Sequence, residues 1–259
     1  GSVRSMLQLE YPTFEVIVVN DGSHDGTLAV LQREFALQAF PQAVEQRLPT
    51  RPVRAIYRSA SHPQLRVIDK DNGGKADSLN AGINLARHPL FCGVDADSLL
   101  ARDSLHRVVR PFLRDPRVVA SGGTVRIANG CRIQGGFLTQ VGLPRNAWAL
   151  FQVVEYLRAF LFGRLGWSQI NAMLIISGAF GLFRTDEVRR VGGFTVGHLG
   201  EDLDITIRLA QQALDSGLVG WLGGQQLLHK PGQAGRVPVH QLHAAGLLRV
   251  EAHLGAGLR

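Results

Sequence analysis

Short apolar runs that end in polar turn residues alternate with segments of helical periodicity along the first 120 residues. Apolar runs at 15–19, 65–68 and 90–94 have the length of strands that are buried on both faces. Apolar residues then recur at helical spacing over 28–35 and 76–86. Strands that alternate with helices predict an α/β fold, with a mostly parallel sheet and helices on both of its faces.

Further elements follow from the same patterns. The periodicity predicts a helix over 105–113, a strand over 118–120 and an aromatic, helix-like segment over 147–167. Residues 36–64 are rich in Gln, Pro and Arg, which indicates an insertion or a surface excursion. Residues 203–214 fit both a strand and a helix, because their apolar positions match both spacings.

The composition changes at about residue 211. A length of 259 residues suits one large domain or two small ones. We expect a domain over 1–210 and an atypical tail over 211–259, in which Gly is frequent and four histidines occur. His240 and His243 match no zinc-site spacing and are expected to lie on the surface.

Charge and cysteine content restrict the class of partner. The chain has 28 Lys and Arg against 21 Asp and Glu, so its formal net charge of +7 suits an anionic partner. The arginines are spread along the chain, so we expect no nucleic-acid partner. Cys92 and Cys131 exclude a disulfide scaffold or a zinc ribbon and suggest a reducing compartment. No signal peptide or transmembrane helix is predicted, and the uncharged stretch 165–183 is expected to be buried or interfacial.

Acidic residues follow two of the predicted strands. Residues i and i+2 of an extended chain point to one side, about 6.5–7 Å apart, so Asp95 and Asp97 suit a divalent cation that carries a diphosphate. A solvated loop that caps the next helix is the alternative. Asp21 follows the strand at 15–19 and suits a nucleobase N–H. The alternative is an Asp-Gly turn with Ser23 as a helix N-cap.

Two more segments carry candidate chemistry. The glycines before Lys75 allow close backbone approach to a phosphate, although an exposed lysine on a flexible turn explains them as well. Glu201 and Asp202 precede the ambiguous segment at 203–214. They suit either the charged first turn of a helix or a general base at a cleft edge.

The order of these motifs resembles that of the family-two inverting glycosyltransferases. The series is Val-Ile-Val-Val-Asn-Asp-Gly-Ser, Asn-Gly-Gly-Lys-Ala-Asp-Ser-Leu-Asn, Val-Asp-Ala-Asp, Ser-Gly-Ala-Phe-Gly-Leu-Phe-Arg and Gly-Glu-Asp-Leu-Asp. It is most similar to bacterial membrane-associated synthases related to those of poly-N-acetylglucosamine, chitin oligosaccharide, hyaluronan and cellulose. The resemblance covers residues 1 to about 210.

This resemblance implies a GT-A fold, a UDP-sugar donor, Mg²⁺ or Mn²⁺, and a β-linked product on a saccharide or lipid acceptor. It implies that Asp202 is the catalytic base, that Ser177, Gly178 and Glu201 lie on the acceptor side, and that Asp97 ligates the metal. It also implies donor binding by Asp21 at the uracil, Lys75 at the nucleotide and Asp95 at the nucleotide-sugar.

The resemblance further implies a location at the cytoplasmic face of the bacterial inner membrane, with the aromatic segment 147–167 near its surface. Arg145, Arg158 and Arg164 would then face lipid phosphates.

The chain departs from the family pattern at both ends. The family's first strand has no counterpart before residue 1, and its Gln-x-x-Arg-Trp segment has none after residue 211, so the domain is expected to be truncated at both ends. Without a replacement from the tail, the sheet would show a gap beside the nucleotide. The alternative functions are a catalytically silent nucleotide-binding or membrane-surface module and a nucleotidyltransferase.

Overall fold

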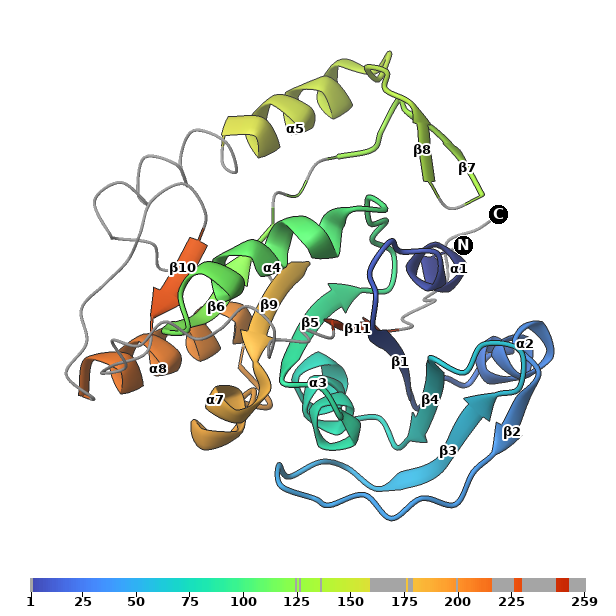
Figure 1. The fold of residues 1–259 in the computed structure, drawn as a ribbon. Coiled ribbons are helices and arrows are strands. Elements are labelled where there is room, and N and C mark those ends of the chain that lie inside the picture. The colour runs from blue at the N-terminus through green and yellow to red at the C-terminus, as the bar shows by residue number, and fades with distance from the viewer. Residues whose placement is uncertain are drawn as a thin grey trace.

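The computed structural model in Figure 1 contains one large sheet covered by helices. The residues that it describes are 2–123, 125, 127–135, 137–158, 176, 179–198, 200–215, 226–229 and 246–251. The helices are α1 (Ser2–Leu7), α2 (Thr27–Glu34), α3 (Gly74–Leu85), α4 (Ser104–Arg114), α5 (Ala147–Leu157), α7 (Thr185–Arg190) and α8 (Glu201–Asp215). The strands of the large sheet are β1 (Phe14–Asp21), β2 (Leu37–Ala39), β3 (Val53–Ser59), β4 (Leu65–Lys70), β5 (Leu90–Asp95), β6 (Val118–Gly122), β9 (Phe180–Arg184), β10 (Gln226–His229) and β11 (Gly246–Glu251). A separate hairpin consists of β7 (Arg132–Gln134) and β8 (Phe137–Gln140).

The sheet has a parallel centre. Its strand order is β10-β6-β9-β5-β11-β1-β4-β3-β2. The four strands β5, β11, β1 and β4 are parallel, and the strands outside them pair antiparallel. The carboxyl ends of the four central strands therefore meet at one edge, where α/β sheets bind ligands.

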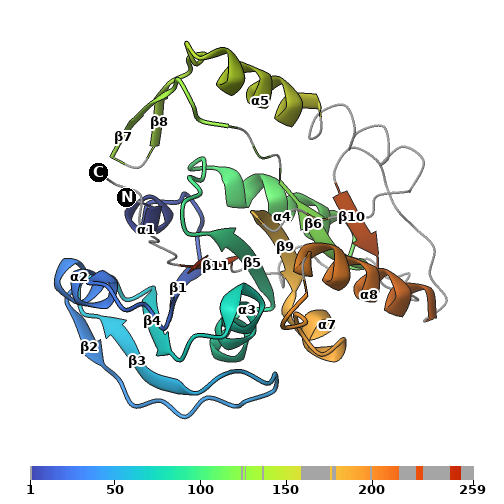
Figure 2. The same ribbon diagram turned by 180° about the vertical axis from the view of Figure 1, so that it is seen from behind.

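Helices cover both faces of the sheet, which confirms the predicted α/β class. Side chains of α1, α2 and α4 pack with Val16 and Val18 of β1 on one face, and side chains of α3, α7 and α8 pack with Ile17 and Val19 on the other. Figures 1 and 2 show α4 and α3 on opposite sides of the central strands. The continuous apolar run of β1 follows from this arrangement, because successive side chains enter different cores.

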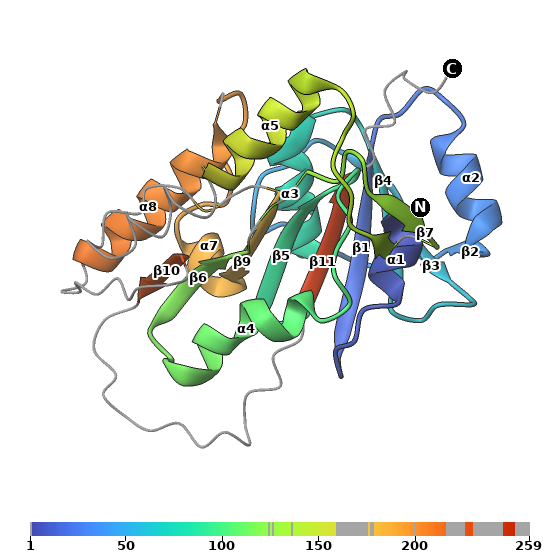
Figure 3. The ribbon, with the colours of Figure 1, turned by 90° about the horizontal axis from the view of Figure 1, so that it is seen from above.

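The tail supplies a central strand. β11 lies between β1 and β5 and is parallel to both, with Val16 in register with Leu248 and Asp95 in register with Glu251. Figure 3 shows β5, β11 and β1 side by side in that order. The gap expected in the absence of a replacement strand is therefore filled by residues 246–251.

The structure revises one local expectation and decides between the alternatives that two other segments left open. Residues 36–64 are more than a surface excursion, because they contain β2 and β3, which extend the sheet. β3 lies next to the sheet edge and stays largely half-exposed, so its sequence lacks a continuous apolar run. Of the two interpretations of 203–214, the structure has the helical one, because this segment belongs to α8. Ser23 is not an N-cap, because α2 begins at Thr27.

Helix α5 and the β7–β8 hairpin stand apart from the helices that cover the sheet (Figures 1 and 2). No side chain of α5 is buried, and Trp148 and Phe151 are 83% and 69% exposed. Their aromatic rings contact each other at a centroid distance of 6.4 Å. The described part of the chain contains no helix that is both long and apolar enough to cross a bilayer.

Candidate active site

Charged residues end the central strands β1, β4 and β5. Asp21 is the last residue of β1, Lys70 the last of β4 and Asp95 the last of β5. Asp21 lies in backbone register with Lys70. The sheet topology therefore places Lys70 and Asp95, which are 49 and 74 positions from Asp21 in the sequence, at the same edge as Asp21.

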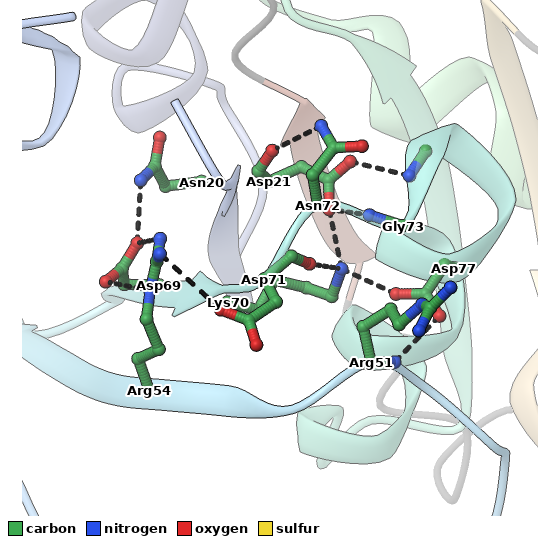
Figure 4. Close-up of polar contacts among 11 residues, drawn as sticks. Asn20, Asp21, Arg51, Arg54, Asp69, Lys70, Asp71, Asn72, Gly73 and Asp77 are labelled. Carbon is green, nitrogen blue, oxygen red and sulfur yellow. Dashed lines mark hydrogen bonds and ion pairs between the residues drawn. The ribbon is translucent and has the colours of Figure 1, made fainter. Parts of the chain in front are cut away.

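Asp21 joins this edge to the first turn of α3. Its Oδ1 atom accepts hydrogen bonds from Lys70 Nζ at 2.5 Å and from the Gly73 N–H at 3.0 Å, and its Oδ2 atom accepts from the Gly74 N–H at 2.7 Å. Asn72 Nδ2 donates to the Asp21 carbonyl at 2.9 Å. Figure 4 shows this network, in which the loop after β4 wraps around the end of β1.

The same contacts set the ionisation of Asp21. Burial by itself raises the pKa of Asp21, but the hydrogen bonds from Lys70, Gly73 and Gly74 and the charge of Lys70 together lower it below its ordinary value. The carboxylate also lies at the N-terminus of α3, where the helix dipole favours a negative charge. Asp21 is therefore ionised at neutral pH.

Lys75 connects α3 to two acidic segments. Its Nζ atom lies 2.9 Å from Asp95 Oδ1 and 3.4 Å from Glu201 Oε1. Burial lowers the pKa of Lys75, but the hydrogen bond and charge of Asp95, followed by the charges of Asp202 and Glu201, raise it above the ordinary value. Lys75 is therefore a cation shared among three carboxylates at the edge of the sheet.

Helix α8 brings Glu201 and Asp202 to this place. Both residues lie in its first turn and are half-buried, and the Thr206 hydroxyl donates to the Asp202 carbonyl at 2.6 Å. The side chain of Arg208 fixes the helix, because it donates to Asp204 Oδ2 and to the carbonyls of Val191 and Gly193.

Asp97 lies two residues beyond the end of β5 and is exposed. No three His, Cys, Asp or Glu side chains of the described residues are grouped to hold a metal ion by themselves. Asp95 and Asp97 still fit a hard cation, because carboxylate oxygens are the ligands that such cations prefer and a bound diphosphate supplies further oxygens.

The structure brings together most of the residues singled out in the sequence. Lys75, Asp95, Glu201 and Asp202 interact, and Asp21 holds the turn that precedes Lys75. Ser177 and Gly178 lie outside the described residues. A small pocket of about 210 Å³ lies behind α3, next to β3 and β4, and none of the candidate residues lines it.

Sequence reasoning missed two residues of this site. Lys70 and Asp77 are buried and form an ion pair at 2.5 Å. Asp77 Oδ2 also accepts a hydrogen bond from the backbone N–H of Arg51 at 2.9 Å. The sequence contains no signal for this pair, because a lysine and an aspartate beside a turn are usually solvated.

The chain thus has a mixed α/β architecture with charged side chains at the carboxyl edge of its parallel strands, and comparison with known families assigns it to a family. The family model described as "Glycosyltransferase like family 2" matches residues 2–218. The chain belongs to this family.

Individual relatives support the same assignment. The chain is 28% identical over 211 residues to poly-beta-1,6-N-acetyl-D-glucosamine synthases of Staphylococcus epidermidis and of Staphylococcus aureus strain COL. The match covers 80% of this chain and 41% of the length of each relative. A mannosyltransferase from Pyrobaculum calidifontis, solved in complex with GDP-Man and Mn²⁺, shares the fold with a TM-score of 0.53 and 21% identity. That match covers 81% of this chain and 47% of the mannosyltransferase chain.

Proposed function

We propose that the chain is an inverting glycosyltransferase domain that moves a sugar from a UDP-sugar to a saccharide or lipid acceptor and forms a β-linked product. The observation that carries the proposal is the position of Lys75. Its ammonium is shared by Asp95 at the end of β5 and by the acidic first turn of α8. One cation thus joins a donor side and an acceptor side.

The donor side consists of Asp21, Lys75, Asp95 and Asp97. Asp21 Oδ2 accepts one N–H from Gly74, and the Asp21 side chain is 1% exposed, so its second lone pair would reach the N–H of a uracil only if the turn 72–74 opened. The Lys75 ammonium suits the negative charge of the nucleotide. Asp97, with Asp95 beside it, would hold Mg²⁺ or Mn²⁺, which offsets negative charge on the leaving diphosphate. The mannosyltransferase of the same fold was solved with Mn²⁺ and a nucleotide-sugar.

The acceptor side consists of Glu201 and Asp202, with Ser177 and Gly178 expected nearby. Asp202 accepts the proton of the acceptor hydroxyl while the hydroxyl oxygen bonds to the anomeric carbon. The bond between that carbon and the UDP oxygen breaks, and UDP leaves with the electron pair. Attack from the face opposite UDP converts an α-linked donor into a β-linked product.

Helix α5 supports a location at a membrane surface, which the resemblance places at the cytoplasmic face of the inner membrane. Trp148, Phe151 and Val154 are exposed apolar residues of one helix, and Arg145 and Arg158 lie beside them. An exposed apolar helix flanked by arginines suits the boundary between acyl chains and anionic headgroups.

Release of UDP tests the enzymatic proposal. The chain is incubated with Mn²⁺ and, in turn, UDP-N-acetylglucosamine, UDP-glucose and UDP-glucuronate, with and without short oligosaccharide acceptors. We expect UDP release that depends on Mn²⁺ and on one donor. UDP binding without release from any donor would instead support the silent nucleotide-binding module.

A further inference from the structure

Lys70 is a fully buried cation next to the proposed donor site. Its side chain has no exposed surface, and its ammonium is surrounded by three oxygens. Nζ lies 2.5 Å from Asp21 Oδ1, 2.5 Å from Asp77 Oδ1 and 2.6 Å from the Asp71 carbonyl oxygen. The ammonium donates hydrogen bonds to Asp21 Oδ1 and to the Asp71 carbonyl, and its contact with Asp77 is an ion pair.

These three oxygens belong to three different segments. Asp21 ends β1, Asp71 begins the loop after β4, and Asp77 lies in the first turn of α3. Figure 4 shows the Lys70 ammonium at the point where the segments meet. Two carboxylates whose side chains are at most 5% exposed would repel each other without the cation between them.

The turn between these contacts has little freedom. A Cβ atom on Gly73 would lie 2.5 Å from Asp77 Cγ, so the backbone passes directly over that carboxylate. The Gly73 and Gly74 N–H groups both donate to Asp21. Lys75 follows at once, so the position of its backbone depends on the contacts of Lys70.

We propose that Lys70 is a positioning residue of the donor site, which fixes the turn 71–74 so that Lys75 faces Asp95 and Glu201. The inference rests on the proposed function, because it assigns the fixed Lys75 to the nucleotide. Lys70 itself touches no substrate, since its ammonium is enclosed by the protein's own oxygens.

A purely stabilising Lys70 makes a different prediction from a positioning one. Loss of a stabilising contact lowers the fraction of folded protein but leaves the nucleotide affinity of the folded molecules unchanged. Loss of a positioning contact lowers that affinity, and the loss depends on Lys75. A double-mutant cycle separates the two cases, because residues that act through one another are not additive.

The test measures UDP binding in the presence of Mn²⁺ by calorimetry, at a temperature where circular dichroism shows each variant to be folded. The main variant, Lys70→Met with Asp77→Asn, removes one charge of each sign and so avoids a pair of uncompensated carboxylates. Asp77→Asn alone is the second variant, which decides the test if the double variant does not fold. Leu105→Ala is the control, because Leu105 is a buried residue of α4 on the opposite face of the sheet.

We expect the double variant to weaken UDP binding about tenfold, by analogy with the loss of residues that orient the ligands of a metal site. Asp77→Asn alone is expected to weaken binding less, and Leu105→Ala to leave it unchanged. In a Lys75→Ala background, the double variant and Asp77→Asn should each weaken UDP binding by less than about twofold. Equal UDP affinity of wild type and folded variants, or the same loss with and without Lys75, would overturn the proposal. Absence of UDP binding by the wild-type chain would overturn the proposed function as well.

Discussion

The ammonium of Lys75 lies 2.9 Å from the carboxylate of Asp95, which ties the first turn of α3 to the end of β5. Lys75 thereby occupies one oxygen of Asp95, which is one of the two carboxylates, with Asp97, that suit a divalent cation. A bound diphosphate would offer Lys75 a further anionic partner and would release Asp95 toward the metal. Donor and cation are therefore expected to bind with positive coupling.

Replacement of Asp97 tests this coupling. Asp97→Ala removes an exposed carboxylate, so its folding stability should stay within about 0.5 kcal/mol of wild type. Addition of Mn²⁺ should raise the UDP affinity of Asp97→Ala by less than about tenfold, and it should raise the UDP affinity of the wild type by more than that. Calorimetric titrations with and without Mn²⁺ measure both values. Asp103→Ala, an exposed carboxylate paired with Arg107 on α4, is the matched control. An unchanged Mn²⁺ effect in Asp97→Ala would exclude Asp97 as a ligand.

Replacement of Asp202 tests the proton acceptor. Asp202→Asn keeps the size of the side chain but removes its basicity, so the rate of sugar transfer should fall by about 10²–10⁴ while UDP affinity stays within about threefold. Asp186→Asn changes an exposed carboxylate in the first turn of α7 and serves as the control. The measurements are initial rates of transfer and UDP binding. Transfer at the wild-type rate by Asp202→Asn would refute the assignment of the base.

The sequence predicted the parts of the structure that depend on local pattern. The apolar run before Asp21 predicted β1, because the side chains of this strand are buried on both faces of the sheet. The order of the motifs, through the family resemblance, predicted that Lys75, Asp95 and Asp202 lie in one site. β11 was not predictable, because Gly-Leu-Leu-Arg-Val-Glu is short and its place is set by strands more than 150 residues away. The Lys70 network was hidden for a similar reason, since burial of its charges depends on three separate segments.

Acid stability should reflect the carboxylate of Asp21. Its pKa is lower in the folded chain than the ordinary value, so the unfolded chain binds more protons between the two values and stability falls as the pH drops. The contribution is complete above about pH 5 and is lost as the pH falls below about 4. Urea unfolding between pH 5 and pH 3 should show a smaller loss of stability for Asp21→Asn than for wild type. Equal losses in the two proteins would contradict the depressed pKa.

The central position of β11 predicts a strong effect of proline. Leu248→Pro removes a backbone N–H from a strand that pairs on both sides. The carbonyl of the neighbouring strand that accepts this N–H loses its partner, which costs roughly 1–3 kcal/mol. Urea unfolding of Leu248→Pro against Leu248→Ala measures the backbone part of this effect. The proline variant should be the less stable of the two. Equal stability would show that residues 246–251 do not complete the sheet in solution.

The exposed face of α5 predicts binding to anionic membranes. Trp148→Ser and Phe151→Ser remove apolar side chains that contribute little to folding, because both are mostly exposed. Burial of such a side chain in the bilayer interface is worth roughly 1–2 kcal/mol, so each variant should bind phosphatidylglycerol vesicles about fivefold to thirtyfold more weakly at an unchanged melting temperature. Co-sedimentation with vesicles measures the affinity, and Leu113→Ser on α4 is a control for loss of an exposed apolar residue elsewhere. If all three variants and the wild type sediment equally, α5 does not contact the membrane. If Leu113→Ser alone weakens binding, the membrane-facing surface lies on α4 instead.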